Sequence, residues 1–262
     1  MNGIARDSVV EFFDRKFVYV FIALTTLASA VAVLSQPEIH VRMDGGLDAA
    51  PMADWLRNPV TKGLSLFLWF MVFLSVLATA DLVPQMLTRG RADFYLSKPI
   101  SRTSLLLSKV FGIWCVYGAT LVICGLMLYI LTVLRQGLFD WGAFYLFAFN
   151  LVIFFIWLSV ITAAGVISRS GGMAILVAAV IWAAQALLSF REGIVNLGGS
   201  KSLGRVLDVF YYVLPKPGEI GELADALALG HAVASWQPVY SSLLFAAVGL
   251  IVAVVVFKRQ SY

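Results

Sequence analysis

Apolar and polar segments alternate along the whole chain, and six of the apolar runs are long enough to cross a bilayer as helices. These runs lie at Phe17–Leu34, Leu64–Ala80, Val110–Leu134, Trp141–Ile167, Gly172–Phe190 and Val239–Phe257. The connections Arg135–Asp140 and Ser168–Gly171 are so short that runs three to five should pack as antiparallel neighbours. Asp140 is placed to act as the N-cap of the fourth run. The pattern predicts an all-α integral membrane protein with six transmembrane helices in a single domain, residues 1–262.

Two polar connections are much longer than the others, at Ser35–Gly63 and Arg191–Gln237. The second contains a helical piece, Glu219–Ala234, in which four side chains fall on one face: Ile220, Leu223, Leu227 and His231. We expect this piece to fold back onto the membrane surface. The preceding pair Tyr211–Tyr212 suits the level of the lipid headgroups.

The first sixteen residues predict an amphipathic helix that lies in the membrane interface. Ser8 and Glu11 fit a capping box, and Val9, Phe13 and Phe17 recur at helical spacing. A frayed N-terminus is the alternative.

Composition and charge agree with a membrane protein. Hydrophobic residues make up 61% of the chain and charged residues only 13%, which excludes a soluble domain of this length. If the spans alternate in direction, eleven Lys or Arg and five acidic residues lie on the side of the N-terminus, against eight and ten on the other. Because Lys and Arg concentrate on the cytoplasmic side, both termini are predicted to be cytoplasmic. The basic residues form no common face, so we expect no nucleic-acid partner.

The longest polar segment on the predicted cytoplasmic side is Asp81–Lys109, between the second and third runs. Pro84 and Pro99 bracket its middle, and because proline interrupts helices, the piece between them should be a separate short helix on the membrane surface. Its adjacent aromatic residues, Phe94 and Tyr95, suit a groove on a protein partner. The alternative is a basic loop that sets topology and touches lipid phosphates.

The run Gly90–Arg102 (GRADFYLSKPISR), followed by Ser108–Gly112 (SKVFG), resembles the cytoplasmic signature of ABC-2 permeases, the membrane subunits of ATP-binding cassette exporters. In that family a glycine and an acidic residue precede an apolar-Ser-x-Pro-x-Ser-Arg turn, and Lys-x-x-Gly opens the next span. The acidic residue that usually precedes the glycine is missing, with Leu87–Arg89 in its place. The motif covers about a tenth of the chain.

The resemblance implies a type V exporter fold, with an N-terminal interfacial helix, a cytoplasmic coupling helix between spans two and three, and an outer helical excursion between spans five and six. It implies a coupling helix that contacts the ATPase subunit through Arg89, Gly90, Arg91, Asp93, Phe94, Tyr95 and Leu96. The signature turn and helix entry would consist of Ser97, Pro99, Ser101, Arg102, Lys109 and Gly112. The implied place is the plasma (inner) membrane, and the implied partners are an ABC ATPase subunit, a second permease subunit, the same or related, and membrane lipid.

Motifs for chemistry within this chain are absent from the sequence. There is no GxxxxGK[ST] loop, so ATP and Mg²⁺ are expected in the partner subunit, with no cofactor, metal or enzymatic activity in this chain. Neither HExxH nor CxxC occurs, and His40 and His231 fit isolated surface residues better than a metal pair.

No charged residue falls at the middle of an apolar run, which argues against an ion-coupled carrier. The most polar residues at depth are Asn150 and Gln185, which we expect to hydrogen-bond between helices, with substrate contact as the alternative. Small residues in the fifth run fit tight helix packing or, alternatively, a dimer seam: Ala174, Ala178, Ala179, Ala183 and Ala184.

Two functions stay open on the sequence. One is the permease half of an ATP-driven exporter, which couples hydrolysis by a separate ATPase to movement of an unidentified substrate. The other is a membrane scaffold that transports nothing and uses the Asp81–Lys109 segment only for docking.

Overall fold

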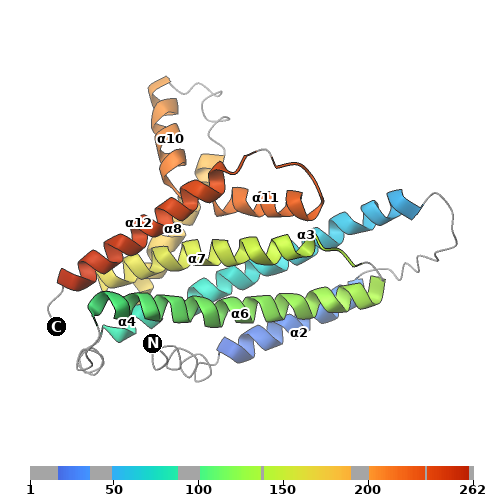
Figure 1. Cartoon of the computed structure of the whole chain (residues 1–262), viewed down its shortest axis with the longest axis horizontal. Helices are drawn as coiled ribbons and strands as arrows, with labels where there is room; N and C mark the ends of the chain where they lie inside the picture. The colour runs from blue at the N-terminus through green and yellow to red at the C-terminus, as the bar shows by residue number, and fades with distance from the viewer. Residues whose placement is uncertain are drawn as a thin grey trace.

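The computed structural model describes residues 17–35, 49–87, 101–136, 139–189, 201–233 and 235–259. Every element in these ranges is a helix (Figure 1). The helices are α2 (Phe17–Ser35), α3 (Ala49–Thr79), α4 (Leu82–Met86), α6 (Arg102–Gln136), α7 (Ala143–Ser168), α8 (Gly171–Ser189), α10 (Lys201–Val213), α11 (Pro217–Ala228) and α12 (Gln237–Arg259). The predicted all-α class is confirmed for the described ranges.

Five segments in these ranges are long and apolar enough to cross a membrane. They are Val60–Met86, Arg102–Arg135, Ala143–Ser168, Gly171–Leu188 and Gln237–Arg259. In α2 the apolar part described at side-chain level is shorter, Tyr19–Ala28. The chain is therefore a multi-pass membrane protein, and the count of six spans stays a prediction.

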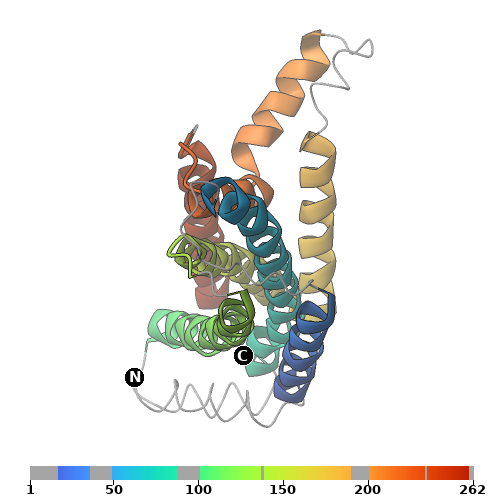
Figure 2. The same cartoon turned by 90° about the vertical axis from the view of Figure 1, so that its right-hand side faces the viewer.

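Helix α7 lies at the centre of the bundle and packs against α3, α6, α8, α11 and α12. Its buried residues recur around the whole helix, including Phe154, Ile156 and Leu158, because neighbours cover it on several sides. Figure 2 shows the same arrangement nearly along the axes of α6 and α7. The predicted packing of the third, fourth and fifth runs as neighbours is confirmed for α6 with α7 and for α7 with α8.

Close helix contacts in this bundle depend on glycine. A Cβ on Gly125 of α6 would lie 2.5 Å from Phe147 Cε1 on α7 and 2.7 Å from Leu68 Cδ2 on α3. A Cβ on Gly118 would lie 2.9 Å from Leu151 Cδ2 on α7. Without side chains at these two positions, α6 approaches its neighbours closely enough for their large apolar groups to interlock.

The bundle has two ends, which we name by what they carry. The proximal end carries α4, the start of α6 and the turn between α7 and α8, and the distal end carries α11 and the start of α7 (Figure 1). The proximal turn is tight, as predicted: Arg169 adopts a left-handed conformation with φ of 56°, and the Ser168 hydroxyl donates to the Ala164 carbonyl at 2.7 Å.

Two helices extend beyond the apolar runs that predicted them. The predicted loop Ser35–Gly63 is helical from Ala49 onward as part of α3, and α6 begins at Arg102, eight residues before Val110. Hydropathy detects only the stretch that matches a bilayer, whereas a helix continues wherever packing or capping supports it. One such support is the ion pair between Lys62 of α3 and Asp225 of α11, at 2.5 Å.

The helical excursion expected before the last span is present as α10 and α11. In α11, Ile220 and Leu223 of the predicted face are buried, because this face packs on α7, α3 and α12. The predicted continuation to His231 is wrong: α11 ends at Ala228, and His231 is exposed beyond it. Helix α10 stands away from the bundle (Figures 1 and 2).

Asp140 does not occupy the N-cap position of α7, which belongs to Gly142. Its carboxylate instead accepts the Gly142 N–H at 2.9 Å, so Asp140 stabilises the turn that leads into the helix. The Tyr129 hydroxyl holds the same residue, because it accepts the Asp140 N–H at 2.8 Å and donates to the Asp140 carbonyl at 2.7 Å. A side chain of α6 thus fixes the entry to α7.

Candidate functional site

The predicted coupling site falls largely outside the described residues. The structure does not describe residues 88–100, and nine of the predicted site residues lie there: Arg89, Gly90, Arg91, Asp93, Phe94, Tyr95, Leu96, Ser97 and Pro99. Ser101, Arg102, Lys109 and Gly112 are described, at the start of α6. The structure therefore defines the two flanks of the polar segment, on α4 and on α6.

The flank on α6 contains the first turns of that helix. The Ser101 hydroxyl accepts the N–H of Ser104 at 3.2 Å and so caps the first turn. Lys109 does not open the helix as the signature implied, because α6 has already begun at Arg102. Lys109 is buried at 2% exposure, and Gly112 one turn further on is also buried. The signature lysine thus belongs to the interior of the bundle.

The other flank is α4, a short helix directly after α3. Its residues Leu82, Val83, Pro84 and Met86 are buried. Pro84 lies inside α4 and packs on α7, whereas the separate helix expected between Pro84 and Pro99 lies mostly outside the described residues. A Cβ on Gly165 of α7 would lie 2.9 Å from Pro84 Cγ. The absence of a side chain at Gly165 makes the contact possible, and a proline ring fills the space.

Asp81 links the same flank to the α7–α8 turn. Its carboxylate lies directly against Gly171, the first residue of α8, in the space that a Cβ would occupy. A carboxylate at the first turn of a helix interacts favourably with the N-terminal end of the helix dipole. Asp81 therefore fixes the end of α3 relative to α8.

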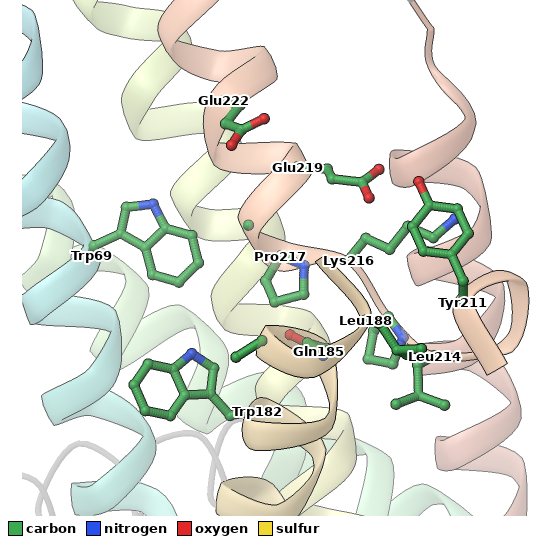
Figure 3. Close-up of a pocket in the computed structure, with 13 residues that line it drawn as sticks. Trp69, Trp182, Gln185, Leu188, Tyr211, Leu214, Lys216, Pro217, Glu219 and Glu222 are labelled. Atoms are coloured by element: carbon green, nitrogen blue, oxygen red, sulfur yellow. The ribbon is translucent and has the colours of Figure 1, made fainter. Parts of the chain in front are cut away.

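A second candidate site is a cavity of about 300 Å³ toward the distal ends of α8 and α12 (Figure 3). Four elements contribute to its wall: α3, α8, the end of α10 and the start of α11. The lining residues with polar or aromatic side chains are Trp69, Trp182, Gln185, Tyr211, Lys216, Glu219 and Glu222. Such a mixture of apolar walls and a few convergent polar groups is typical of a small-molecule site.

Two indole rings form one side of this cavity, Trp69 from α3 and Trp182 from α8 (Figure 3). Trp69 is held in place from behind, because a Cβ on Gly221 of α11 would lie only 2.7 Å from its Nε1. Trp182 is 59% exposed, so its ring is accessible from the surroundings of the bundle.

The charged residues of the cavity differ in burial and in the contacts they make. Lys216 is 6% exposed, and its ammonium donates to Gln237 Oε1 at 3.0 Å and lies 3.8 Å from the centre of the Tyr211 ring. Glu219 is half-buried and Glu222 exposed, and they lie one turn apart on α11. The Glu219 carboxylate points toward Tyr211 in Figure 3. The formal charge of the lining is therefore negative by one.

Asn150 and Gln185 were predicted to form hydrogen bonds between helices, and the structure differs. Asn150 donates to the Leu146 carbonyl of its own helix at 2.8 Å. Gln185 lines the cavity, and within the described ranges its buried Nε2 has no hydrogen-bond partner. The described residues therefore show no interhelical hydrogen bond for either side chain, and of the two only Gln185 lines the cavity.

Small residues of α8 divide between two faces. Ala174 and Ala178 are buried against the bundle, which fits the prediction of tight packing. Ala179 and Ala183 are exposed on the outer side of the helix.

Sequence reasoning did not identify the cavity residues Trp69, Trp182, Glu219 and Glu222. The available signal was the pair Glu219 and Glu222 at i,i+3 in a piece already predicted to be helical. Among the described residues no group of three or more His, Cys, Asp or Glu could hold a metal ion. No family model matches the chain, and a search of curated proteins likewise finds no match.

Proposed function

We propose that the chain is the permease subunit of an ATP-binding cassette exporter in the plasma (inner) membrane, with both termini in the cytoplasm. It couples ATP hydrolysis by a separate ATPase subunit to movement of a substrate across the membrane. ATP and Mg²⁺ belong to the ATPase, and a second permease subunit, the same or related, completes the pathway. The sequence carries this proposal through the ABC-2 signature in Gly90–Gly112.

The observation that supports it most is the anchoring of the signature segment on both sides. Before it, Met86 and Leu87 are 3% and 6% exposed; after it, Leu105 and Leu106 are 3% and 0% exposed. A docking segment held by buried side chains at both flanks moves together with α3–α4 and α6. A displacement imposed by a partner would therefore reach the packed spans, because closely packed interiors transmit strain.

In this mechanism the Arg89–Leu96 helix docks into a groove of the ATPase. Phe94 and Tyr95 would be its anchors, because aromatic rings buried in a partner pocket are the contacts most costly to truncate, at about 2 kcal/mol or more. Arg89, Arg91 and Asp93 would orient the helix at the rim, where ion pairs contribute under about 1 kcal/mol. A scaffold that does not transport would dock through the same residues without affecting hydrolysis.

The test is co-purification of an ATP-binding cassette ATPase expressed together with the permease, with the double variant Phe94→Ala, Tyr95→Ala. We expect the ATPase yield to fall at least about tenfold, whereas Arg89→Ala changes it little. Phe210→Ala with Tyr212→Ala, two exposed aromatics on α10, is the matched control and should leave the yield unchanged.

An unchanged yield for the Phe94, Tyr95 variant would refute the coupling helix. A wild-type complex whose ATPase rate does not respond to the permease would favour the scaffold. Native mass spectrometry of the same preparation should show two permease subunits per complex, and an active complex with a single one would contradict the pairing.

A further inference from the structure

The distal cavity combines three kinds of side chain that come from different parts of the chain. Carboxylates come from α11, aromatic faces from α3, α8 and α10, and an amide from α8 (Figure 3). We propose that the cavity binds a small organic ammonium cation, such as choline or ethanolamine. The inference does not depend on the proposed function, because binding is measured without an ATPase.

Charge in the cavity selects for a cation. Glu219 and Glu222 contribute two carboxylates, and Lys216 contributes one ammonium that already bonds to Gln237. The remaining negative charge lies in a partly enclosed space, where attraction for a cation is stronger than in open water.

Aromatic rings strengthen the preference for an ammonium. Trp69 and Trp182 present indole rings, which attract cations more strongly than the rings of Tyr or Phe. The structure already contains one such contact, since the Lys216 ammonium lies 3.8 Å from the centre of the Tyr211 ring. That contact uses the rings on one side of the cavity and leaves the indoles on the other side for a ligand (Figure 3).

Gln185 adds an uncharged amide to the wall of the cavity. Its Nε2 is buried and has no hydrogen-bond partner among the described residues, so this atom is not itself accessible to a bound molecule. The preference for an ammonium therefore depends on the carboxylates and the indole rings.

Size and position agree with this ligand. A volume of about 300 Å³ is at the small end of ligand sites and suits a headgroup or a small solute rather than a large drug. Trp182 and Gln185 lie in the last two turns of the α8 span, and exposed Trp182 reaches the surroundings of the bundle, where lipid headgroups lie. The ligand could thus come from a free solute or from a lipid.

The test uses purified protein in nanodiscs of phosphatidylglycerol, with radiolabelled choline as the probe in a scintillation proximity assay. We expect saturable binding of choline. Its uncharged isostere 3,3-dimethyl-1-butanol, in which carbon replaces the ammonium nitrogen, should compete at least about tenfold more weakly. Absence of saturable binding, or equal competition by the isostere, would overturn the proposal.

Variants assign the binding to the cavity. Glu222→Gln and Trp182→Leu should each weaken choline binding about tenfold, because they remove a charge or an indole at exposed positions with little effect on folding. The matched controls are Asp208→Asn on α10 and Trp141→Leu before α7, which lie outside the lining. Controls that weaken binding as much as the cavity variants would refute the site.

A second arm identifies the source of the ligand. Phosphatidylcholine added to the nanodiscs should reduce binding of free choline if lipid headgroups enter the cavity, and it should leave binding unchanged if only solutes enter. Either result is expected under the proposal, provided the Glu222→Gln variant loses the same binding.

Discussion

The ammonium of Lys62 on α3 lies 2.5 Å from Oδ2 of Asp225 on α11, and this ion pair joins helices that are far apart in the sequence. The Lys62 side chain is 58% exposed, whereas that of Asp225 is only 12% exposed. The two partners therefore differ in what their loss would cost. Removing Lys62 leaves a mostly buried carboxylate without its cation, whereas removing the charge of Asp225 leaves a solvated lysine.

Lys62→Met should therefore destabilise the protein more than Asp225→Asn. We expect about 1 to 3 kcal/mol for Lys62→Met, because the carboxylate keeps its burial and its Oδ1 already lacks a partner among the described residues. The double variant should recover part of this loss. Thermal unfolding in detergent measures all three, and an equal loss for the two single variants would contradict the asymmetry.

Gly221 should tolerate no side chain, because α11 packs on Trp69 at this point. A Cβ there would lie 2.7 Å from Trp69 Nε1, so Gly221→Ala should cost about 1 to 3 kcal/mol through forced displacement of the ring. Gly218→Ala on the same helix is the matched control, since no atom lies within 4 Å of its Cβ position. Melting temperatures compare the two. Because alanine favours helix more than glycine does, Gly218→Ala should not lower the melting temperature. A loss as large at Gly218 as at Gly221 would show that the Trp69 contact does not govern the effect.

Gly171 should likewise tolerate no side chain, because it lies in contact with Asp81. Gly171→Ala places a methyl group in the space of the Asp81 carboxylate, whereas at Gly172 the closest atom to a Cβ is Ser170 Oγ at 3.8 Å. Gly171→Ala should lower the melting temperature, and Gly172→Ala should change it little.

Asp81→Ala combined with Gly171→Ala should restore only part of the stability, because the Asp81 Cα lies 3.0 Å from the same position. The melting temperature of the double variant measures the recovery. No recovery at all would show that the backbone, and not the carboxylate, causes the conflict.

Orientation in the membrane is a prediction from charge, and cysteine labelling tests it. On a background in which Cys115 and Cys124 are replaced by Ala, Asp44→Cys should react with an impermeant maleimide on intact cells. Arg169→Cys in the α7–α8 turn should react only after the membrane is opened, because Lys and Arg concentrate on the cytoplasmic side. The reverse pattern would invert the predicted topology.

Properties that depend on local composition could be predicted from the sequence. The runs at Trp141–Ile167 and Val239–Phe257 predicted α7 and α12 closely, because a bilayer requires about 20 consecutive apolar residues. The tight turn at Ser168–Gly171 and the helix around Ile220 and Leu223 were also correct. Helix ends were less accurate, as the early starts of α3 and α6 show.

The candidate sites also differ in whether a local sequence pattern predicts them. The signature in Gly90–Gly112 is contiguous, so the sequence alone predicts a coupling segment, and its central residues lie outside the described ranges. The burial of Pro84 against Gly165 could not be predicted, because proline in a polar segment more often marks a turn.

By itself the sequence determined that this chain crosses a membrane several times, since hydropathy along the chain decides whether a helix is more stable in lipid or in water. Only the tertiary structure decided which polar and aromatic groups meet. Trp69 and Glu222 belong to helices more than half the chain apart, and they line one cavity because α11 packs over Gly221 against α3. Contacts of this kind depend on the packing of many side chains at once, which no local pattern of residues encodes.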